Sequence, residues 1–272
     1  MTVWVGTSWK MNKTLAEARQ YTSELLEGLD RLELGTVQPF IIPPATALSA
    51  VAGALVDDGR VLLGAQNAHW EDNGAWTGEV SVPQVADAGA QLVEIGHSER
   101  REHFRETDQT VRRKVAAVLR HGLTPLLCIG EPAEVREAGG SSDFILGQAA
   151  RALEGLSAPE LSRVLIAYEP VWAIGAAGRP AAPEELRSSF AALAGSFGQH
   201  TAGLLYGGSV AEDNAAALLG IPHVDGLFIG RAAWEADGYL RLLETAAATA
   251  GTPAAGRLSP DTNESAEEVG TK

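Results

Sequence analysis

The sequence predicts a single (β/α)8 barrel, an α/β fold in which each of eight parallel strands is followed by a helix. Short apolar segments and amphipathic segments alternate along the chain, and eight such pairs can be counted. Each pair spans roughly 30 residues, which is typical of a βα unit in a parallel sheet. A chain of 272 residues is long enough to build one such domain with a sizeable core.

The predicted strands are short apolar runs with the length and β-branched content of buried parallel strands. The second run is followed by two prolines, which cannot continue a sheet ladder. In chain order the strands are Val3–Gly6, Phe40–Ile42, Val61–Gly64, Leu92–Ile95, Pro125–Ile129, Val164–Ala167, Gly203–Tyr206 and Gly226–Ile229.

Amphipathic segments between these runs predict the helices. The first helix follows Thr14, whose hydroxyl can cap it. In chain order the helices span about Leu15–Leu29, Ala45–Val56, Pro83–Ala88, Asp108–Arg120, Phe144–Leu156, Pro183–Phe197, a short segment after Glu212, and Gly238–Ala248.

A doubly wound open sheet is the main alternative fold. Such a sheet usually carries a glycine-rich dinucleotide loop after its first strand, whereas this chain has Thr7–Asn12 there. We therefore expect residues 1–250 to form one barrel domain. Residues 251–272 are rich in proline, glycine, serine, threonine and acids, and are expected to form a disordered or loosely attached tail.

Composition excludes several functional classes. Hydrophobic residues make up 45% of the chain, yet no apolar run reaches the roughly 18 residues of a membrane span and no signal peptide is expected. The net charge of -14 argues against nucleic acid and membrane surfaces as partners, and an anionic substrate would need local cations. The single cysteine, Cys128, is expected to be a buried strand residue, and no spacing of metal ligands is present. We expect a cytoplasmic protein without a metal.

The stretch Ala167–Ala177 contains the main candidate for a catalytic base. Glu169 follows a predicted strand, Pro170 blocks continuation of that strand, and an apolar flap with small residues follows. A carboxylate beside a flap that can exclude water suits a general base. Taken alone, the stretch is equally compatible with an ordinary strand end and loop.

Polar and glycine residues follow other strands as well. In a barrel of this kind the active site lies at the carboxyl ends of the strands, so these residues would converge. Each alone is weak evidence, since a lone lysine is usually a surface charge and a Gly-Gly-Ser segment is usually a turn. The set consists of Lys10, His97, Ser98, Glu99, Glu169, Gly207, Gly208, Ser209, Gly230 and Arg231.

This set indicates proton transfer on a phosphorylated carbonyl compound. The two glycine turns and Gly175 of the flap can point backbone N–H groups at a phosphate. Glu169 could then remove a proton from a carbon next to a carbonyl, while Lys10 and His97 stabilise the oxygen charge of the enediolate.

The sequence resembles the triosephosphate isomerase family over about residues 3–248. The resemblance implies the barrel, proton transfer without a cofactor, and a homodimer. The matching segments are Ser8–Asn12, Gly64–Asn67, Trp76–Glu79, Gly96–Arg101, Leu127–Glu131, Ala167–Gly175, Tyr206–Val210 and Asp225–Gly230.

The resemblance also implies roles for individual residues. Glu169 resembles the base, His97 the neutral electrophile and Lys10 the lysine on the substrate oxygens, with Glu99 a carboxylate beside it. The phosphate would be held by Gly175, Gly208, Ser209 and Gly230. The loop Asn67–Glu79 is the candidate dimer contact, with Thr77 near the partner's site.

Four features of the sequence depart from the usual pattern of that family. Ser8 replaces an asparagine beside Lys10, and Arg231 replaces a glycine near the phosphate. The flap ends in Gly175-Ala176-Ala177-Gly178, where the family usually has Gly-Thr-Gly or a similar triplet. The third loop carries His69-Trp70, and Trp76 replaces a common phenylalanine. We expect Ser8 and Arg231 to contact substrate, although Arg231 could also be a solvated residue at the rim.

These departures resemble the L-erythrulose-1-phosphate isomerase branch of the family, which acts in erythritol catabolism. That branch implies interconversion of L-erythrulose 1-phosphate and D-erythrulose 4-phosphate. Glycolytic triosephosphate isomerase activity is the alternative, and a sensor that binds a sugar phosphate without turning it over is a third reading. The presence of Lys10, His97 and Glu169 argues against the sensor, because a binder does not need a base.

Overall fold

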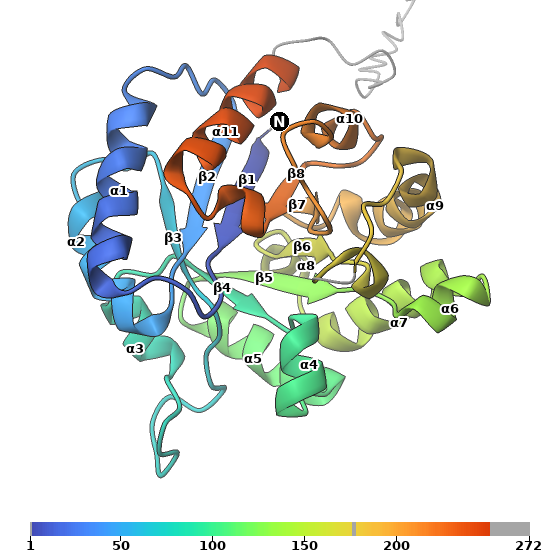
Figure 1. The fold of residues 1–272 in the computed structure, drawn as a ribbon. Coiled ribbons are helices and arrows are strands. Elements are labelled where there is room, and N and C mark those ends of the chain that lie inside the picture. Colours follow the sequence, from blue (N-terminus) through green and yellow to red (C-terminus); the bar gives the residue numbers. More distant parts are fainter. Residues whose placement is uncertain (1, 176–177, 251–272) are drawn as a thin grey trace, which may run out of the picture.

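Eight parallel strands pair in chain order and close into a barrel through a contact between β1 and β8, as the computed structural model shows for residues 2–175 and 178–250 (Figure 1). The predicted fold class is confirmed, and all eight predicted strands are present with ends that differ by at most three residues. The strands are β1 (Val3–Ser8), β2 (Val37–Ile42), β3 (Leu62–Ala65), β4 (Leu92–Ile95), β5 (Thr124–Ile129), β6 (Leu165–Tyr168), β7 (Gly203–Tyr206) and β8 (Gly226–Ile229).

Helices surround the barrel (Figure 1). Thr14 caps the first of them, as predicted, by accepting a hydrogen bond from the backbone N–H of Glu17. The α-helices among the described residues are α1 (Leu15–Leu29), α2 (Leu48–Leu55), α3 (Val82–Asp87), α4 (Ser98–Phe104), α5 (Asp108–Arg120), α6 (Ala133–Glu137), α7 (Ser141–Leu153), α8 (Ala158–Leu161), α9 (Pro183–Leu193), α10 (Ala215–Leu219) and α11 (Ala236–Ala250).

Three short helices are absent from the prediction, namely α4, α6 and α8. None of the three has a buried residue, so their sequences lack the apolar periodicity that identifies a helix. The helix predicted to reach Phe197 leaves α-helical geometry after Leu193 and continues as a π-helical turn, η3 (Ala194–Gly198). Short 3₁₀ turns also occur, at η1 (Ala45–Ala47), η2 (Val171–Ala173) and η4 (Arg231–Ala233).

The barrel is filled with side chains rather than open along its axis. Alternate residues of the strands point inward and form a buried apolar cluster, and the residues between them pack against the helices in a second, larger core. Cys128 belongs to the inner cluster, which confirms that it is a buried strand residue. The inner cluster consists of Phe40, Ile42, Leu92, Leu126, Cys128, Leu165, Ala167, Leu205 and Phe228.

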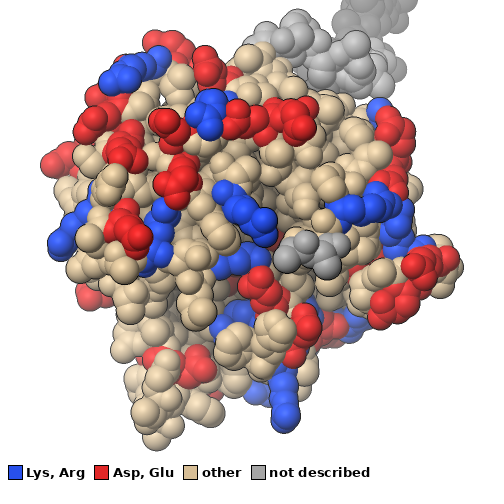
Figure 2. All heavy atoms as spheres, viewed as in Figure 1, with Lys and Arg blue, Asp and Glu red and all other residues tan. Residues whose placement is uncertain are grey.

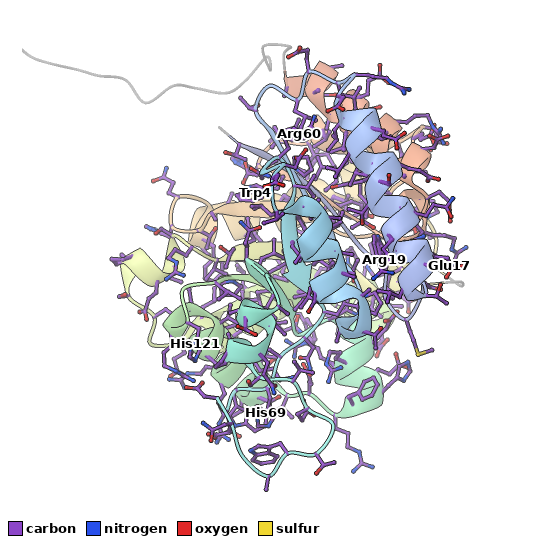
Figure 3. The ribbon with its side chains drawn as sticks, turned by 90° about the vertical axis from the view of Figure 1, so that its left-hand side faces the viewer. Trp4, Glu17, Arg19, Arg60, His69 and His121 are labelled. Carbon is purple, nitrogen blue, oxygen red and sulfur yellow. The ribbon has the colours of Figure 1, made fainter. Side chains whose placement is uncertain are left out.

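The segment of residues 66–81 projects from the barrel between β3 and α3 (Figure 1). Three aromatic rings pack in it, with the ring of His69 4.1 Å from that of Trp70 and 4.5 Å from that of Trp76. The side view in Figure 3 shows His69 within this projection. Trp76 is 49% exposed, which is unusual for so large an apolar side chain.

Acidic and basic side chains are interspersed on the face shown in Figure 2, with basic residues scattered singly or in small groups. No helix in residues 2–175 and 178–250 is long and apolar enough to cross a membrane. The predicted tail at 251–272 and two flap residues, Ala176 and Ala177, lie outside the described residues.

Candidate active site

A cavity of about 580 Å³ opens at the carboxyl ends of the strands. The ten residues for which the sequence predicts a catalytic or substrate-binding role all line it, although they come from five different strand ends and the flap, whereas Ser98 does not line it. They are Ser8, Lys10, His97, Glu99, Glu169, Gly175, Gly208, Ser209, Gly230 and Arg231. Ile174, Phe228 and Trp234 contribute apolar surface to the same cavity.

Four polar side chains meet in this cavity. Nε2 of His97 lies 3.7 Å from Oε2 of Glu169, and both side chains are buried. Nζ of Lys10 lies 2.6 Å from Oε1 of Glu99, whose Oε2 is 3.8 Å from Nδ1 of His97. The arrangement therefore joins two carboxyl groups, an imidazole and an ammonium group around one space.

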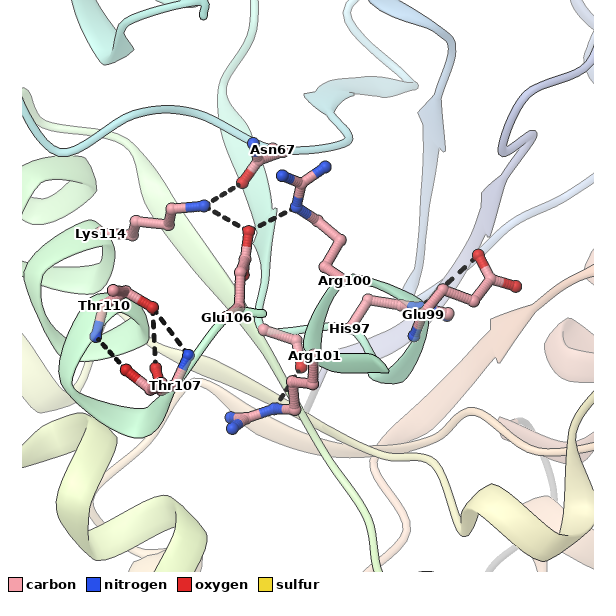
Figure 4. Close-up of polar contacts among 10 residues, drawn as sticks. Asn67, His97, Glu99, Arg100, Arg101, Glu106, Thr107, Thr110 and Lys114 are labelled. Carbon is pink, nitrogen blue, oxygen red and sulfur yellow. Dashed lines mark hydrogen bonds and ion pairs between the residues drawn. The ribbon is translucent and has the colours of Figure 1, made fainter. Parts of the chain in front are cut away.

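The hydrogen bonding of His97 defines its tautomer. His97 is the N-cap of α4, and its Nδ1 accepts a hydrogen bond of 3.1 Å from the backbone N–H of Glu99 (Figure 4). Burial and the nearby Lys10 ammonium lower the pKa of His97 to about 4, so the ring is neutral near pH 7. A neutral ring that accepts at Nδ1 carries its proton on Nε2, which faces Glu169 and can donate to a substrate oxygen.

Glu169 has the environment of a strong base. Burial raises the pKa of its carboxyl group to about 8, with a further contribution from the charge of Glu94, while Lys10 opposes the rise. No described residue donates a hydrogen bond to Oε2 of Glu169. Gly207 is required opposite this side chain, because a Cβ there would lie 2.6 Å from Cγ of Glu169.

Lys10 is held in a conformation that lysine rarely adopts. Its backbone φ is +51°, in the left-handed region, directly after β1. Burial opposes the charged form, but the hydrogen bond from Lys10 to Glu99 and the charges of Glu99 and Glu169 outweigh it and raise the pKa of Lys10. The ammonium group therefore stays charged inside the cavity.

The glycine turns after β7 and β8 leave backbone donors at the cavity wall. The amides of Gly208 and Gly230 make no hydrogen bond to another residue in the described part of the chain. Ser209 differs from the expectation, since both its backbone N–H and its Oγ donate to the carbonyl of Ala173, at 2.9 and 2.7 Å. Arg231 is exposed at the same wall and has no ion pair within the described residues.

Two buried acids near the site are absent from the residues predicted for it. Glu131 accepts hydrogen bonds from Nε1 of Trp172 at 2.8 Å and from the hydroxyl of Tyr168 at 3.1 Å, and so anchors the start of the flap. Glu94 lies in β4 on the inner side of the barrel and is only 4% exposed. A charged residue within an otherwise apolar four-residue strand is the sequence signal that could have identified Glu94.

Two further predictions concern groups away from the floor of the cavity. Thr77 does not line it and is exposed in the projecting segment 66–81. No group of three histidine, cysteine, aspartate or glutamate side chains in residues 2–175 and 178–250 is arranged to hold a metal ion.

Known proteins resemble this chain in sequence and in fold. Residues 3–246 match the family described as triosephosphate isomerase. The chain belongs to the triosephosphate isomerase family. A solved triosephosphate isomerase from Bartonella henselae superimposes with a TM-score of 0.79 at 34% identity, covering 90% of this chain and 99% of that one.

Within the triosephosphate isomerase family, two similar relatives carry another name. An L-erythrulose-1-phosphate isomerase from Mycolicibacterium smegmatis is 68% identical over 246 residues, which cover 90% of this chain and 94% of that protein. One from Mesorhizobium japonicum is 49% identical, over 90% of this chain and 97% of that protein. The resemblance seen in the sequence, to the family and to this branch, is thereby confirmed.

Proposed function

We propose that the protein is an isomerase that interconverts L-erythrulose 1-phosphate and D-erythrulose 4-phosphate through an enediol or enediolate. The observation that carries the proposal is the convergence of Glu169, His97 and Lys10 on one cavity. The names of the relatives at 68% and 49% identity support the four-carbon substrate.

In the proposed complex, one end of the cavity binds the phosphate group and the other holds the reacting carbons. The phosphate would bind at the turns after β7 and β8, where the amides of Gly208 and Gly230 and the guanidinium of Arg231 face the cavity. Gly175 of the flap would add a further amide on closure, and Ser209 would join by releasing the carbonyl of Ala173. This grip would place the carbonyl and its neighbouring carbon beside Glu169.

Proton transfer can then proceed with the residues at the floor. Glu169 takes the proton from the carbon next to the carbonyl, and the pair of electrons moves into the enediolate. The Lys10 ammonium and the Nε2–H of His97 stabilise the oxygen charge. Glu169 returns the proton to the adjacent carbon, while the hydroxyl proton moves from one oxygen to the other beside His97.

The test is a direct comparison of kcat/KM for L-erythrulose 1-phosphate and D-glyceraldehyde 3-phosphate with the purified protein. We expect a clear preference for the tetrose phosphate. A preference for the triose phosphate would instead support the glycolytic activity, which the family name and the Bartonella henselae structure favour. Absence of turnover, with no exchange of substrate protons into solvent, would support a sensor.

We also propose that the protein forms a homodimer through the loop Asn67–Glu79, with Thr77 near the partner's site. The exposed ring of Trp76 and the outward projection of this loop support the proposal. Sedimentation of the wild type and of Thr77→Arg would test it, since the variant should dissociate. The proposed substrate would place the enzyme in the cytoplasmic breakdown of erythritol.

A further inference from the structure

Glu94 is a carboxyl group inside the barrel. Leu92 of the same strand belongs to the inner cluster, whereas Val93 and Ile95 pack outward against the helices. Alternation along the strand therefore points Glu94 inward, one step nearer the cavity than Leu92. At 4% exposure, such a group is disfavoured unless something compensates it.

Lys10 and Arg100 favour the charged form of Glu94, but no described residue gives its Oε2 a hydrogen bond. The charged and titratable groups near it are Lys10, Glu99, Arg100, Cys128 and Glu169. The Ser8 hydroxyl on β1 is close enough to lower the pKa of Glu94, but the two groups do not meet hydrogen-bond geometry. Oε2 of Glu94 and Oγ of Ser8 are both buried without a hydrogen-bond partner among the described residues.

Two other buried acids of this chain have structural roles and are partnered by neighbouring side chains. Glu131 accepts hydrogen bonds from Tyr168 and Trp172, and Glu106 pairs with Lys114 and Arg100. Oε2 of Glu94 is buried with no hydrogen-bond partner among the described residues. The same is true of Oε2 of Glu169, whose side chain lines the space for substrate.

The order of the strands indicates which part of a substrate would meet these groups. In a barrel of eight strands, β4 lies across from β8, where Gly230 and Arg231 line the cavity. A sugar phosphate held at β8 therefore extends past Glu169 toward the β4 side. L-Erythrulose 1-phosphate differs from a triose phosphate by a hydroxymethyl group at the end remote from the phosphate.

We propose that Ser8 and Glu94 form the subsite for this terminal hydroxymethyl group. Ser8 lines the cavity, and rotation about its Cα–Cβ bond would bring its buried Oγ within reach of the terminal hydroxyl of the substrate, which donates to it. The Ser8 hydroxyl donates in turn to Glu94 beneath it. Ser8 thus binds the substrate, and Glu94 is a positioning residue that acts through Ser8. The inference rests on the tetrose phosphate proposed above as substrate.

The kinetic test compares Ser8→Ala, Glu94→Gln and Glu94→Leu with the wild type. For each variant we expect the ratio of kcat/KM for L-erythrulose 1-phosphate to that for D-glyceraldehyde 3-phosphate to fall by roughly tenfold or more, mainly through KM for the tetrose. The double variant Ser8→Ala/Glu94→Gln should lose no more than the single variants, because both changes interrupt one chain of hydrogen bonds. Leu126→Val is the matched control, since Leu126 is buried beside Glu94 in the next strand and should leave the ratio unchanged.

A binding measurement separates this subsite from the chemistry. A tetritol phosphate and glycerol phosphate lack the carbonyl group, so calorimetric affinities for them report the hydroxymethyl group alone. We expect the wild type to bind the tetritol phosphate more tightly and Ser8→Ala to lose that difference. An unchanged difference in Ser8→Ala, or equal losses on both substrates in the Glu94 variants, would overturn the subsite. A wild type that turns over only the triose phosphate would overturn the proposed function, whatever the variants do.

Discussion

Oε2 of Glu169 lies 3.7 Å from Nε2 of His97 although the two residues follow different strands, β6 and β4. The pair combines a carboxylate whose pKa is raised to about 8 with an imidazole whose pKa is lowered to about 4. A base that binds protons readily therefore stands beside a neutral donor of a hydrogen bond. This pairing is what moving a proton between adjacent carbons requires.

Substitution of Glu169, the proposed base, should separate binding from catalysis. Glu169→Gln keeps the size of the side chain but removes its basicity, so we expect kcat to fall by roughly 2 to 4 orders of magnitude while the affinity for a tetritol phosphate changes little. Steady-state kinetics and calorimetry would measure the two quantities. Glu244→Gln, an exposed change on α11, serves as the control. Near-normal turnover in Glu169→Gln would contradict the mechanism.

The acidic limb of the pH profile should respond to Glu94. Glu169 must be ionised to accept a proton, so kcat/KM should decline as the pH falls below about 8, the pKa of its carboxyl group. The charge of Glu94 contributes to that raised pKa, after burial, so Glu94→Gln should lower the pKa of Glu169 and move the limb to lower pH. His97, with a pKa of about 4, should add no inflection between pH 6 and 9. A limb that stays in place in Glu94→Gln would refute this coupling.

Loss of Arg231 should weaken binding of the phosphate group. Its side chain lines the cavity beside Gly230, and Arg231→Ala should raise KM by roughly tenfold with a smaller effect on kcat. Inhibition by inorganic phosphate should weaken in parallel. Arg241→Ala is the matched control, because Arg241 lies on α11 and pairs with Glu212. Equal KM values for the two variants would assign Arg231 to the solvated rim.

The ion pairs of the buried Glu106 should contribute to the stability of the fold rather than to catalysis. Glu106 pairs with Lys114 and Arg100, and Nζ of Lys114 donates to Oδ1 of Asn67 at 2.8 Å (Figure 4). Lys114→Met leaves Glu106 buried with fewer partners, so we expect the free energy of unfolding to fall by about 3 kcal/mol in urea titrations. The double variant Lys114→Met/Glu106→Leu should regain part of the loss. An equal free energy of unfolding for Lys114→Met and the wild type would show that the ion pair between Lys114 and Glu106 does not stabilise the fold.

Much of the fold and the site follows from local sequence patterns. Strands such as Gly226–Ile229 are apolar and followed by glycine, and the residues placed after them converge because parallel strands end on one face of a barrel. Helix α4 could not be predicted in this way, because it buries none of its residues. Capping hydrogen bonds at its two ends, made by His97 and Arg105, stabilise it instead. The attachment of Ser209 to Ala173 also depends on how the flap packs against the turn after β7, which no local pattern encodes.

Among the described residues, the packed interior closes the cavity from the opposite end of the barrel. Phe40, Leu126 and Phe228 fill the barrel beneath the cavity, and each is at most 4% exposed. A sugar cannot pass through the barrel from one end to the other, so we expect substrate to enter and product to leave at the carboxyl ends of the strands.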